Sequence, residues 1–131
     1  MSNLPSTTSI EPETRPAIRY PRHPAHLDPF VEELGAALAV RFLIAFAGST
    51  LYFPTDPRGR SAAEAVIGKD RLQALGARMP SNRAEVPVPR TWLILALTAE
   101  GKSTADICRA LKVTAKTVKT ARRENRWKVP T

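Results

Sequence analysis

The sequence predicts a mainly α-helical protein with a short β element, built as an N-terminal helical dimerisation region followed by a C-terminal helix-turn-helix. Three observations lead to this fold class. Apolar residues recur at helical spacing over 30–46 and again between 90 and 121. Two short extended pieces that end in proline, 49–54 and 84–89, lie between those stretches. A hydrophobic fraction of 43% in 131 residues is sufficient for one packed core.

Positive charge is concentrated in the last quarter of the chain. The formal net charge is +8, and residues 101–131 contain nine lysines or arginines against two acidic residues, a net +7. A basic segment of this kind favours a polyanion, here double-stranded DNA, as the partner. The one cysteine, Cys108, cannot form an internal disulfide, and we expect it to be a buried structural residue of a cytoplasmic, nucleoid-associated protein.

The N-terminal segment, residues 1–26, holds five of the twelve prolines among serine, threonine and charged residues. Because proline removes backbone donors and restricts φ, we expect a disordered arm there. His23 and His26 lie in this arm without a third ligand, so no metal or other cofactor is expected. The remainder divides into a helical and β-strand dimerisation region, 27–89, and a helix-turn-helix domain with a basic tail, 90–131.

The first predicted helix begins at Asp28 and Pro29 and ends at Gly48. Its apolar residues cover more than one face, so the helix needs more than one neighbour. In so short a chain we expect the second neighbour to be another subunit, joined also through a short edge strand that Pro54 ends. The residues expected to form this dimer contact are Val31, Leu34, Leu38, Phe42, Phe46, Leu51, Tyr52 and Phe53.

Two shorter helices are expected next. Ser61 is a good N-cap for a helix that ends at Gly68, and Asp70 can cap a second helix that runs to Met79. The extended piece 84–89 then leads into the C-terminal part of the chain.

Three helices are predicted in the C-terminal part. The first covers 90–100 and ends at Gly101, Ser103 caps the second, and Thr114 caps the third. The residues that should face inward are Ile107, Ala110, Leu111, Val113, Val118 and Ala121. One continuous helix cannot place both 111 and 113 inward, so a helix-turn-helix is favoured over a single kinked helix. Lys112 stands at the turn, where glycine is common, and is strained there if its φ is positive.

The third of these helices has the composition of a recognition helix in the major groove of DNA. Its exposed residues up to position 123 include no acidic side chain. Ala115, Lys116 and Thr120 are expected to contact bases, because lysine donates to guanine O6 and N7 and methyl groups contact the thymine methyl. The residues expected to contact phosphates are Lys102, Thr104, Thr117, Lys119, Arg122 and Arg123.

A sequence signature upstream of this unit adds a family resemblance. Residues 46–54, FAGSTLYFP, are similar to the G-G-x-x-L-Y-I-P signature of the Mor/C transcription activators of Mu-like phages and prophages, with Ala47 in place of the first glycine. Together with the short helix ending at Gly68 and the helix-turn-helix, residues 27–123 resemble that family. The resemblance implies an intertwined homodimer, paired helix-turn-helix units on a dyad-symmetric promoter site, and contact with RNA polymerase.

Other classes of function remain as alternatives. A repressor or an anti-activator could be built on the same domain, and a DNA-packaging or architectural protein could carry a similar basic unit. An enzyme is not expected, because the sequence offers no Ser-His-Asp set, no glycine-rich phosphate loop and no metal cluster. No membrane span is expected either, since the apolar stretch 35–48 is short and contains Arg41. No small-molecule ligand is evident.

Overall fold

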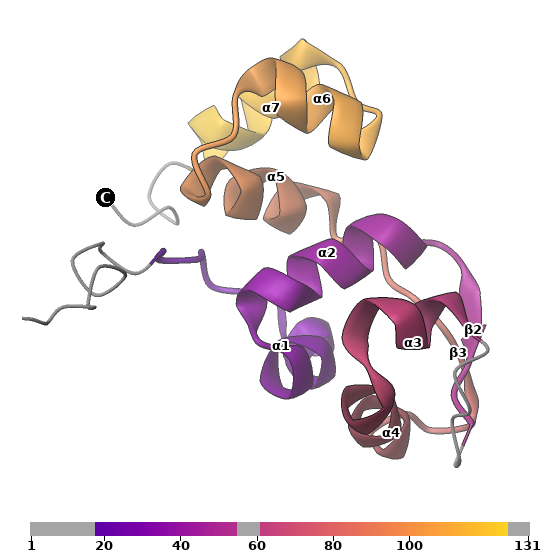
Figure 1. Ribbon diagram of the computed structural model, residues 1–131. Helices are drawn as coiled ribbons and strands as arrows, with labels where there is room; N and C mark the ends of the chain where they lie inside the picture. The colour runs from indigo at the N-terminus through magenta and orange to yellow at the C-terminus, as the bar shows by residue number, and fades with distance from the viewer. Residues whose placement is uncertain (1–17, 55–60, 126–131) are drawn as a thin grey trace, which may run out of the picture.

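The computed structural model describes residues 18–54 and 61–125, and this part of the chain is mostly helical with a small two-stranded sheet. Figure 1 shows two layers, with α5, α6 and α7 on one side and α1 to α4 on the other. The expected fold class is therefore confirmed: a mainly α protein with a short β element and a C-terminal helix-turn-helix. In chain order the elements are η2 (Ala25–Leu27), α1 (Asp28–Leu34), α2 (Ala36–Phe46), β2 (Thr50–Tyr52), α3 (Ala62–Ile67), α4 (Lys69–Ala77), β3 (Arg83–Glu85), α5 (Arg90–Ala99), α6 (Thr104–Leu111) and α7 (Ala115–Glu124).

The single helix expected from Asp28 to Gly48 is in fact two helices. Gly35 separates α1 from α2 and has φ 79° and ψ 155°, a conformation that side chains with a Cβ rarely adopt. A Cβ built at Gly35 would meet no atom within 4 Å, so the glycine is needed for its backbone conformation and not for packing. The apolar periodicity continues across the break, which is why the sequence pattern indicates one helix.

The break lets the chain cover its own apolar faces. Phe42 of α2 is fully buried, with its ring centroid 5.9 Å from that of Phe30 in α1 and 5.0 Å from that of Phe46. Leu34 and Phe53 are also buried within the single chain. The expectation that a second subunit must cover these three residues is therefore wrong, because α1, α3, α4 and α5 supply the neighbours.

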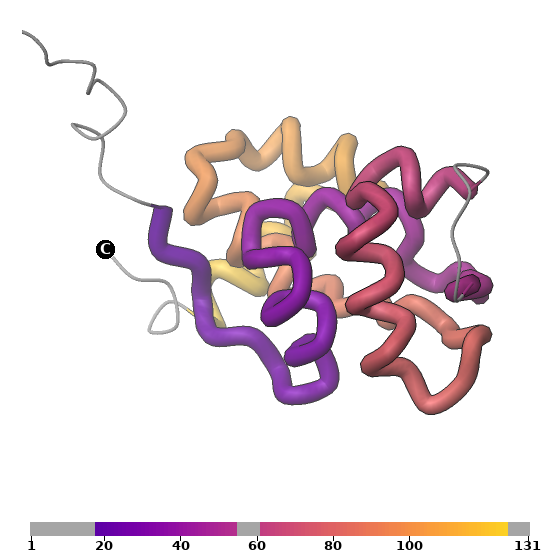
Figure 2. The backbone as a smooth tube through the Cα atoms, turned by 60° about the horizontal axis from the view of Figure 1, so that its bottom comes forward, coloured from indigo at the N-terminus to yellow at the C-terminus, as the bar shows by residue number. Residues whose placement is uncertain are grey.

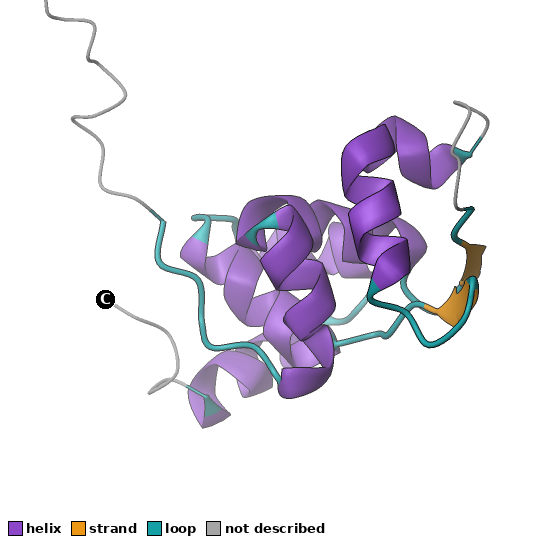
Figure 3. Ribbon diagram, turned by 90° about the horizontal axis from the view of Figure 1, so that it is seen from below, coloured by secondary structure: helices purple, strands orange, loops and turns teal. Residues whose placement is uncertain are grey.

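The expected edge strand pairs within the chain. β2 and β3 are antiparallel, with Leu51 opposite Ala84 and Tyr52 opposite Arg83. The Val86 and Ser49 backbones extend the ladder by one hydrogen bond of 2.8 Å. Figure 3 shows this small sheet at one edge of the helical body. Each strand keeps one outer edge unpaired within the described residues.

Of the N-caps predicted before α5, the one at Ser61 is confirmed and those at Asp70 and Asp28 are wrong. The Ser61 hydroxyl accepts a hydrogen bond of 3.0 Å from the Glu64 amide, as predicted. Asp70 is not an N-cap, because α4 begins one residue earlier, at Lys69, and Asp70 lies in its first turn. Asp28 is likewise the first residue of α1, and its carboxylate pairs with His23 at 2.8 Å.

Residues 18–26 of the expected disordered arm are packed on the helices, so the prediction is wrong for them. The buried Trp92 indole N–H donates to the Pro21 carbonyl at 3.0 Å, and the Tyr20 hydroxyl donates to the Glu100 carboxylate at 2.7 Å. A proline-rich extended segment keeps its carbonyls free, and a buried indole needs such an acceptor. Figure 2 shows the segment running along the side of the molecule into α1. Residues 1–17 of that arm lie outside the described residues.

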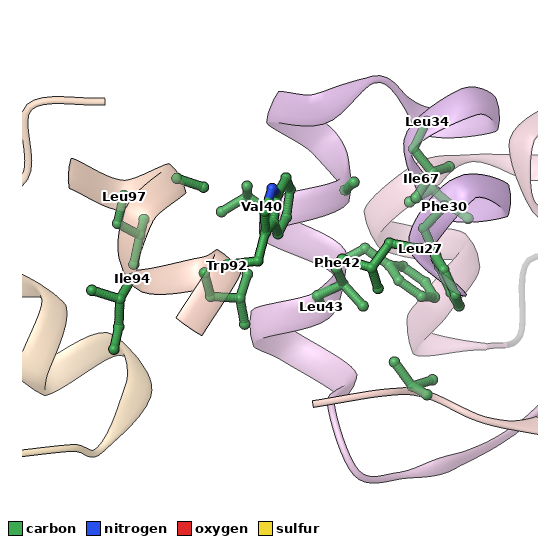
Figure 4. Packing of buried hydrophobic residues seen from close by; sticks show 14 of the residues in the cluster. Leu27, Phe30, Leu34, Val40, Phe42, Leu43, Ile67, Trp92, Ile94 and Leu97 are labelled. Carbon is green, nitrogen blue, oxygen red and sulfur yellow. The ribbon is translucent and has the colours of Figure 1, made fainter. Parts of the chain in front are cut away.

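The middle of helix α5 is buried on every side. Six consecutive residues, 92–97, are buried, although an amphipathic helix would expose about half of them. Figure 4 shows Trp92 beside Val40 of α2, with Ile94 and Leu97 on the opposite side of α5. One hydrophobic cluster therefore includes residues of both layers.

The Tyr20 contact predicts a pH dependence of stability. Burial, together with the Glu100 carboxylate, raises the pKa of Tyr20 from 10.0 to about 12. The folded state thus holds the phenol proton more tightly than the unfolded chain does. This contribution to stability is complete below pH 10 and is lost as pH rises toward 12.

We therefore expect Tyr20→Phe to lower the free energy of unfolding near neutral pH by about 1 kcal/mol, because it removes a hydrogen bond to a charged group. The variant should also lose less stability than wild type between pH 10 and pH 12. Urea unfolding followed by circular dichroism measures both effects. The matched control is Tyr52→Phe at the exposed second tyrosine. Identical pH profiles for the two variants would contradict the assignment.

Candidate nucleic-acid interface

The first helix of the helix-turn-helix, α6, is fixed at its start by a cap. The Ser103 hydroxyl accepts a hydrogen bond of 3.1 Å from the Asp106 amide, which confirms the predicted N-cap. The Ser103 hydroxyl and the nearby Arg109 guanidinium hold the pKa of Asp106 below its usual range. Ile107 is fully buried, whereas Ala110, expected to face inward, is exposed. The reason is geometric, because Ile107 and Leu111 are one helical turn apart and Ala110 falls to the side.

The turn between α6 and α7 depends on a left-handed residue. Lys112 has φ 58° and ψ 47°, and among the described residues it alone combines a side chain with a positive φ. The amides of Lys112 and Val113 both donate to the Cys108 carbonyl, which closes the end of α6 and redirects the chain. The strain suspected from the sequence is thus present. Cys108 is half-buried, not fully buried as expected.

The second helix, α7, presents its first turn to solvent. Thr114 caps it, since its hydroxyl accepts a hydrogen bond of 3.2 Å from the Thr117 amide. Val118 and Ala121 are the buried residues of the helix. Of the residues predicted to contact bases, Ala115 and Lys116 are exposed and Thr120 is half-buried. Lys116 and Thr120 are four residues apart and therefore share one face.

A shallow depression of about 300 Å³ runs between this face of α7 and the start of α5. Lys116, Thr117 and Thr120 line it from α7, and Arg90 and Thr91 line it from α5. The sequence analysis missed Arg90 and Thr91, because their place beside the recognition helix depends on how α5 crosses α7. The available signal was an arginine at the first position of a helix whose centre, residues 92–97, is entirely apolar.

The residues predicted to contact phosphates fall into two groups. Lys102, Thr117, Lys119 and Arg123 are exposed, although the Thr117 hydroxyl lies 3.0 Å from that of Thr114. Arg122 and Thr104 are half-buried and bonded to each other, with Arg122 Nη1 donating to Thr104 Oγ1 at 2.8 Å.

Arg122 is therefore not a free cation on the surface of α7. Its Nε also donates to Thr98 Oγ1 at 2.9 Å, and its Nη2 lies 3.5 Å from the Lys102 carbonyl oxygen. The expectation that Arg122 is available to DNA in the same way as Arg123 is corrected by these contacts. The basic tail expected at 126–131 lies outside the described residues.

Within the described residues, no group of three or more histidine, cysteine, aspartate or glutamate side chains is placed to hold a metal ion. None of the helices in that part of the chain is both long and apolar enough to cross a membrane.

Comparison with known proteins agrees with this geometry. Residues 88–128 match the GerE family model, described as bacterial regulatory proteins of the luxR family. The match begins just before α5 and includes α6 and α7, so it covers the whole three-helix unit. These residues form a helix-turn-helix DNA-binding domain of a transcription-regulator family. No curated protein and no solved structure matches the chain.

The left-handed turn residue gives a stability prediction. A left-handed conformation costs a residue with a Cβ about 1–2 kcal/mol, and glycine loses about 0.5–1 kcal/mol more chain entropy on folding. Lys112→Gly should therefore raise the free energy of unfolding by up to about 1 kcal/mol. Lys112→Ala is the control, because it removes the charge and keeps the Cβ. Equal urea midpoints for the two variants would show that backbone strain at this turn is unimportant.

Proposed function

We propose, from the helix-turn-helix domain at residues 88–128, that this chain is a transcription regulator that reads a specific DNA sequence with the first half of α7. One observation carries the proposal. The first turn of α7 is exposed and its first two turns contain no acidic residue, and the helix rests on α5, whose residues 92–97 are buried. A rigid, basic helix held away from the body of a protein suits insertion into the major groove.

Base recognition is assigned to three residues of α7. Lys116 can donate to O6 and N7 of guanine, and the methyl groups of Ala115 and Thr120 can contact a thymine methyl. The support is that Ala115 and Lys116 are exposed at the start of the helix and that Thr120, which is half-buried, lies one turn beyond Lys116 on the same face. The exposed cations Lys119 and Arg123 of α7, and Lys102 just before α6, suit phosphates.

Arg90 is a further residue that we propose to contact a DNA phosphate. It is exposed at the start of α5 and lines the depression shared with Lys116. A duplex lying along α7 would pass over this depression, so a phosphate could be bound between the two helices.

We further propose that the regulator binds as a homodimer. Helix-turn-helix proteins commonly read two half-sites that are related by a two-fold axis. Tyr52 supports a contact at the sheet, because it is 55% exposed on a strand whose outer edge is unpaired within the described residues. Leu51, Val31, Leu38 and Phe46 are only partly buried and could extend that contact.

Activation through RNA polymerase is the proposed mode of regulation. Its support is the similarity of residues 46–54 to the Mor/C signature, which here forms the end of α2 and the strand β2. A repressor would use the same DNA contacts, so transcript levels from a promoter that carries the bound site separate the two modes. Transcripts that fall when the protein is added would contradict activation.

Two variants of α7 distinguish residues that contact bases from residues that contribute only charge. Duplexes are first selected from a random library with the wild-type protein. Lys116→Ala should then cost about 1–3 kcal/mol on the selected duplex and relax the preference at one base position. Arg123→Ala should weaken binding to selected and scrambled duplexes about equally and lower the salt slope by about one unit. Equal weakening of both duplexes by Lys116→Ala would remove that residue from the base contacts.

The dimer is tested by sedimentation equilibrium at micromolar concentration. Wild type should sediment as a dimer, and Tyr52→Asp should shift it toward monomer with an unchanged helical circular dichroism spectrum. Phe42→Asp cannot serve here, because Phe42 is fully buried in the single chain and a charge there should unfold it. Thr91→Asp, at an exposed site on α5 and outside the two strands, is the control for added charge. A monomeric wild-type protein would contradict the proposal.

A further inference from the structure

The side chain of Arg122 leaves α7 on the inner side of the domain and reaches two other helices. Its Nε donates to Thr98 of α5 at 2.9 Å, and its Nη1 donates to Thr104 of α6 at 2.8 Å. Its Nη2 lies 3.5 Å from the carbonyl oxygen of Lys102, just before α6. One guanidinium thus connects all three helices of the DNA-binding domain.

Helix α7 packs on α5 and α6, but few of its side chains are buried. Val118 and Ala121 are its buried residues, and both are small. Two small side chains leave a helix free to roll by a few degrees at little cost, because few dispersion contacts are lost. Arg122 lies one turn beyond Val118, on the same face of α7. Its hydrogen bonds therefore act where α7 packs on α5 and α6, which is the contact about which α7 would roll.

We infer that Arg122 is a positioning residue, which sets the angle of α7 for base readout and does not contact a phosphate. The inference rests on the proposed function in DNA binding. Lys116 and Thr120 lie on the other side of the helix, so a small roll of α7 on α5 and α6 moves both side chains relative to a base edge. The planar guanidinium suits this role because its donors point in fixed directions toward separate acceptors.

The adjacent Arg123 provides a matched control. It has the same side chain and charge, but it is exposed, whereas Arg122 is half-buried. A phosphate contact and a positioning contact differ in what their loss changes. Loss of a phosphate contact weakens all sequences and lowers the salt slope. Loss of positioning lowers the preference for the correct sequence at an unchanged salt slope.

The test compares Arg122→Met and Arg123→Met in the full chain. Binding is measured by fluorescence anisotropy at several salt concentrations, well below the melting temperature of each variant. The probes are a duplex selected from a random library with the wild-type protein and a scrambled duplex of the same composition.

Arg122→Met should lower the ratio of the two affinities about tenfold, the equivalent of one lost base contact, and leave the salt slope unchanged. Arg123→Met should lower the slope by about 0.9 and leave the ratio unchanged. Arg122→Lys keeps the charge but loses the planar donors, so the ratio of the affinities for the selected and scrambled duplexes should also fall in this variant.

Three results would overturn the inference. In the first, Arg122→Met behaves as Arg123→Met, which makes Arg122 a phosphate contact. In the second, Arg122→Met lowers only the melting temperature, which makes the contacts merely stabilising. In the third, Arg122→Lys retains the wild-type ratio, which makes charge alone sufficient. A wild-type protein with no preferred duplex would instead contradict the proposed function itself.

A second variant keeps the test decisive if Arg122→Met does not fold. Thr98→Val with Thr104→Val removes both hydroxyl acceptors, keeps the side-chain shapes and leaves the guanidinium in place. This double variant should show the same fall in the affinity ratio with the wild-type salt slope. Retention of the wild-type ratio would exclude the positioning role.

Discussion

The burial of the middle of α5 on all sides is the constraint on which the rest of the structure depends. A helix that is apolar around its whole circumference must be covered from every direction. In this chain α2 covers one side of α5, while α6 and α7 cover the other. The DNA-binding unit and the upstream helices therefore share a single core, and α7 is held at a defined position relative to α2.

Polar contacts at the two ends of α5 strengthen this arrangement. At its start the Trp92 indole is bound by the Pro21 carbonyl, and just beyond its end the Glu100 side chain is only 4% exposed. A carboxylate with so little access to water needs partners, and Tyr20 and Arg41 provide them from two distant segments. A dimer contact at the small sheet would therefore set the spacing of two recognition helices without a flexible linker between them.

The two neighbouring arginines of α7 illustrate how position determines the role of a charge. Arg123 faces solvent and is available to a polyanion, whereas Arg122 is engaged by Thr98, Thr104 and the Lys102 carbonyl. Both are consecutive basic residues on a helix that the charge pattern assigns to DNA. Sequence alone treats them as equivalent because the difference lies in the acceptors that α5 and α6 place beside one of them.

The sequence by itself determined the helix-turn-helix and its basic recognition helix. The signals there are local: Ser103 and Thr114 cap the helices that follow them, and the change of register near Lys112 excludes one continuous helix. Only the tertiary structure decided how Phe42 and Phe53 are covered, where residues 18–26 lie, and that Arg90 joins the face of α7. The physical reason is that these features depend on partners remote in the chain, as the bond from Tyr20 to Glu100, 80 positions further along, illustrates. Caps and periodicity act within a few residues, whereas burial and hydrogen-bond partners depend on packing between distant segments.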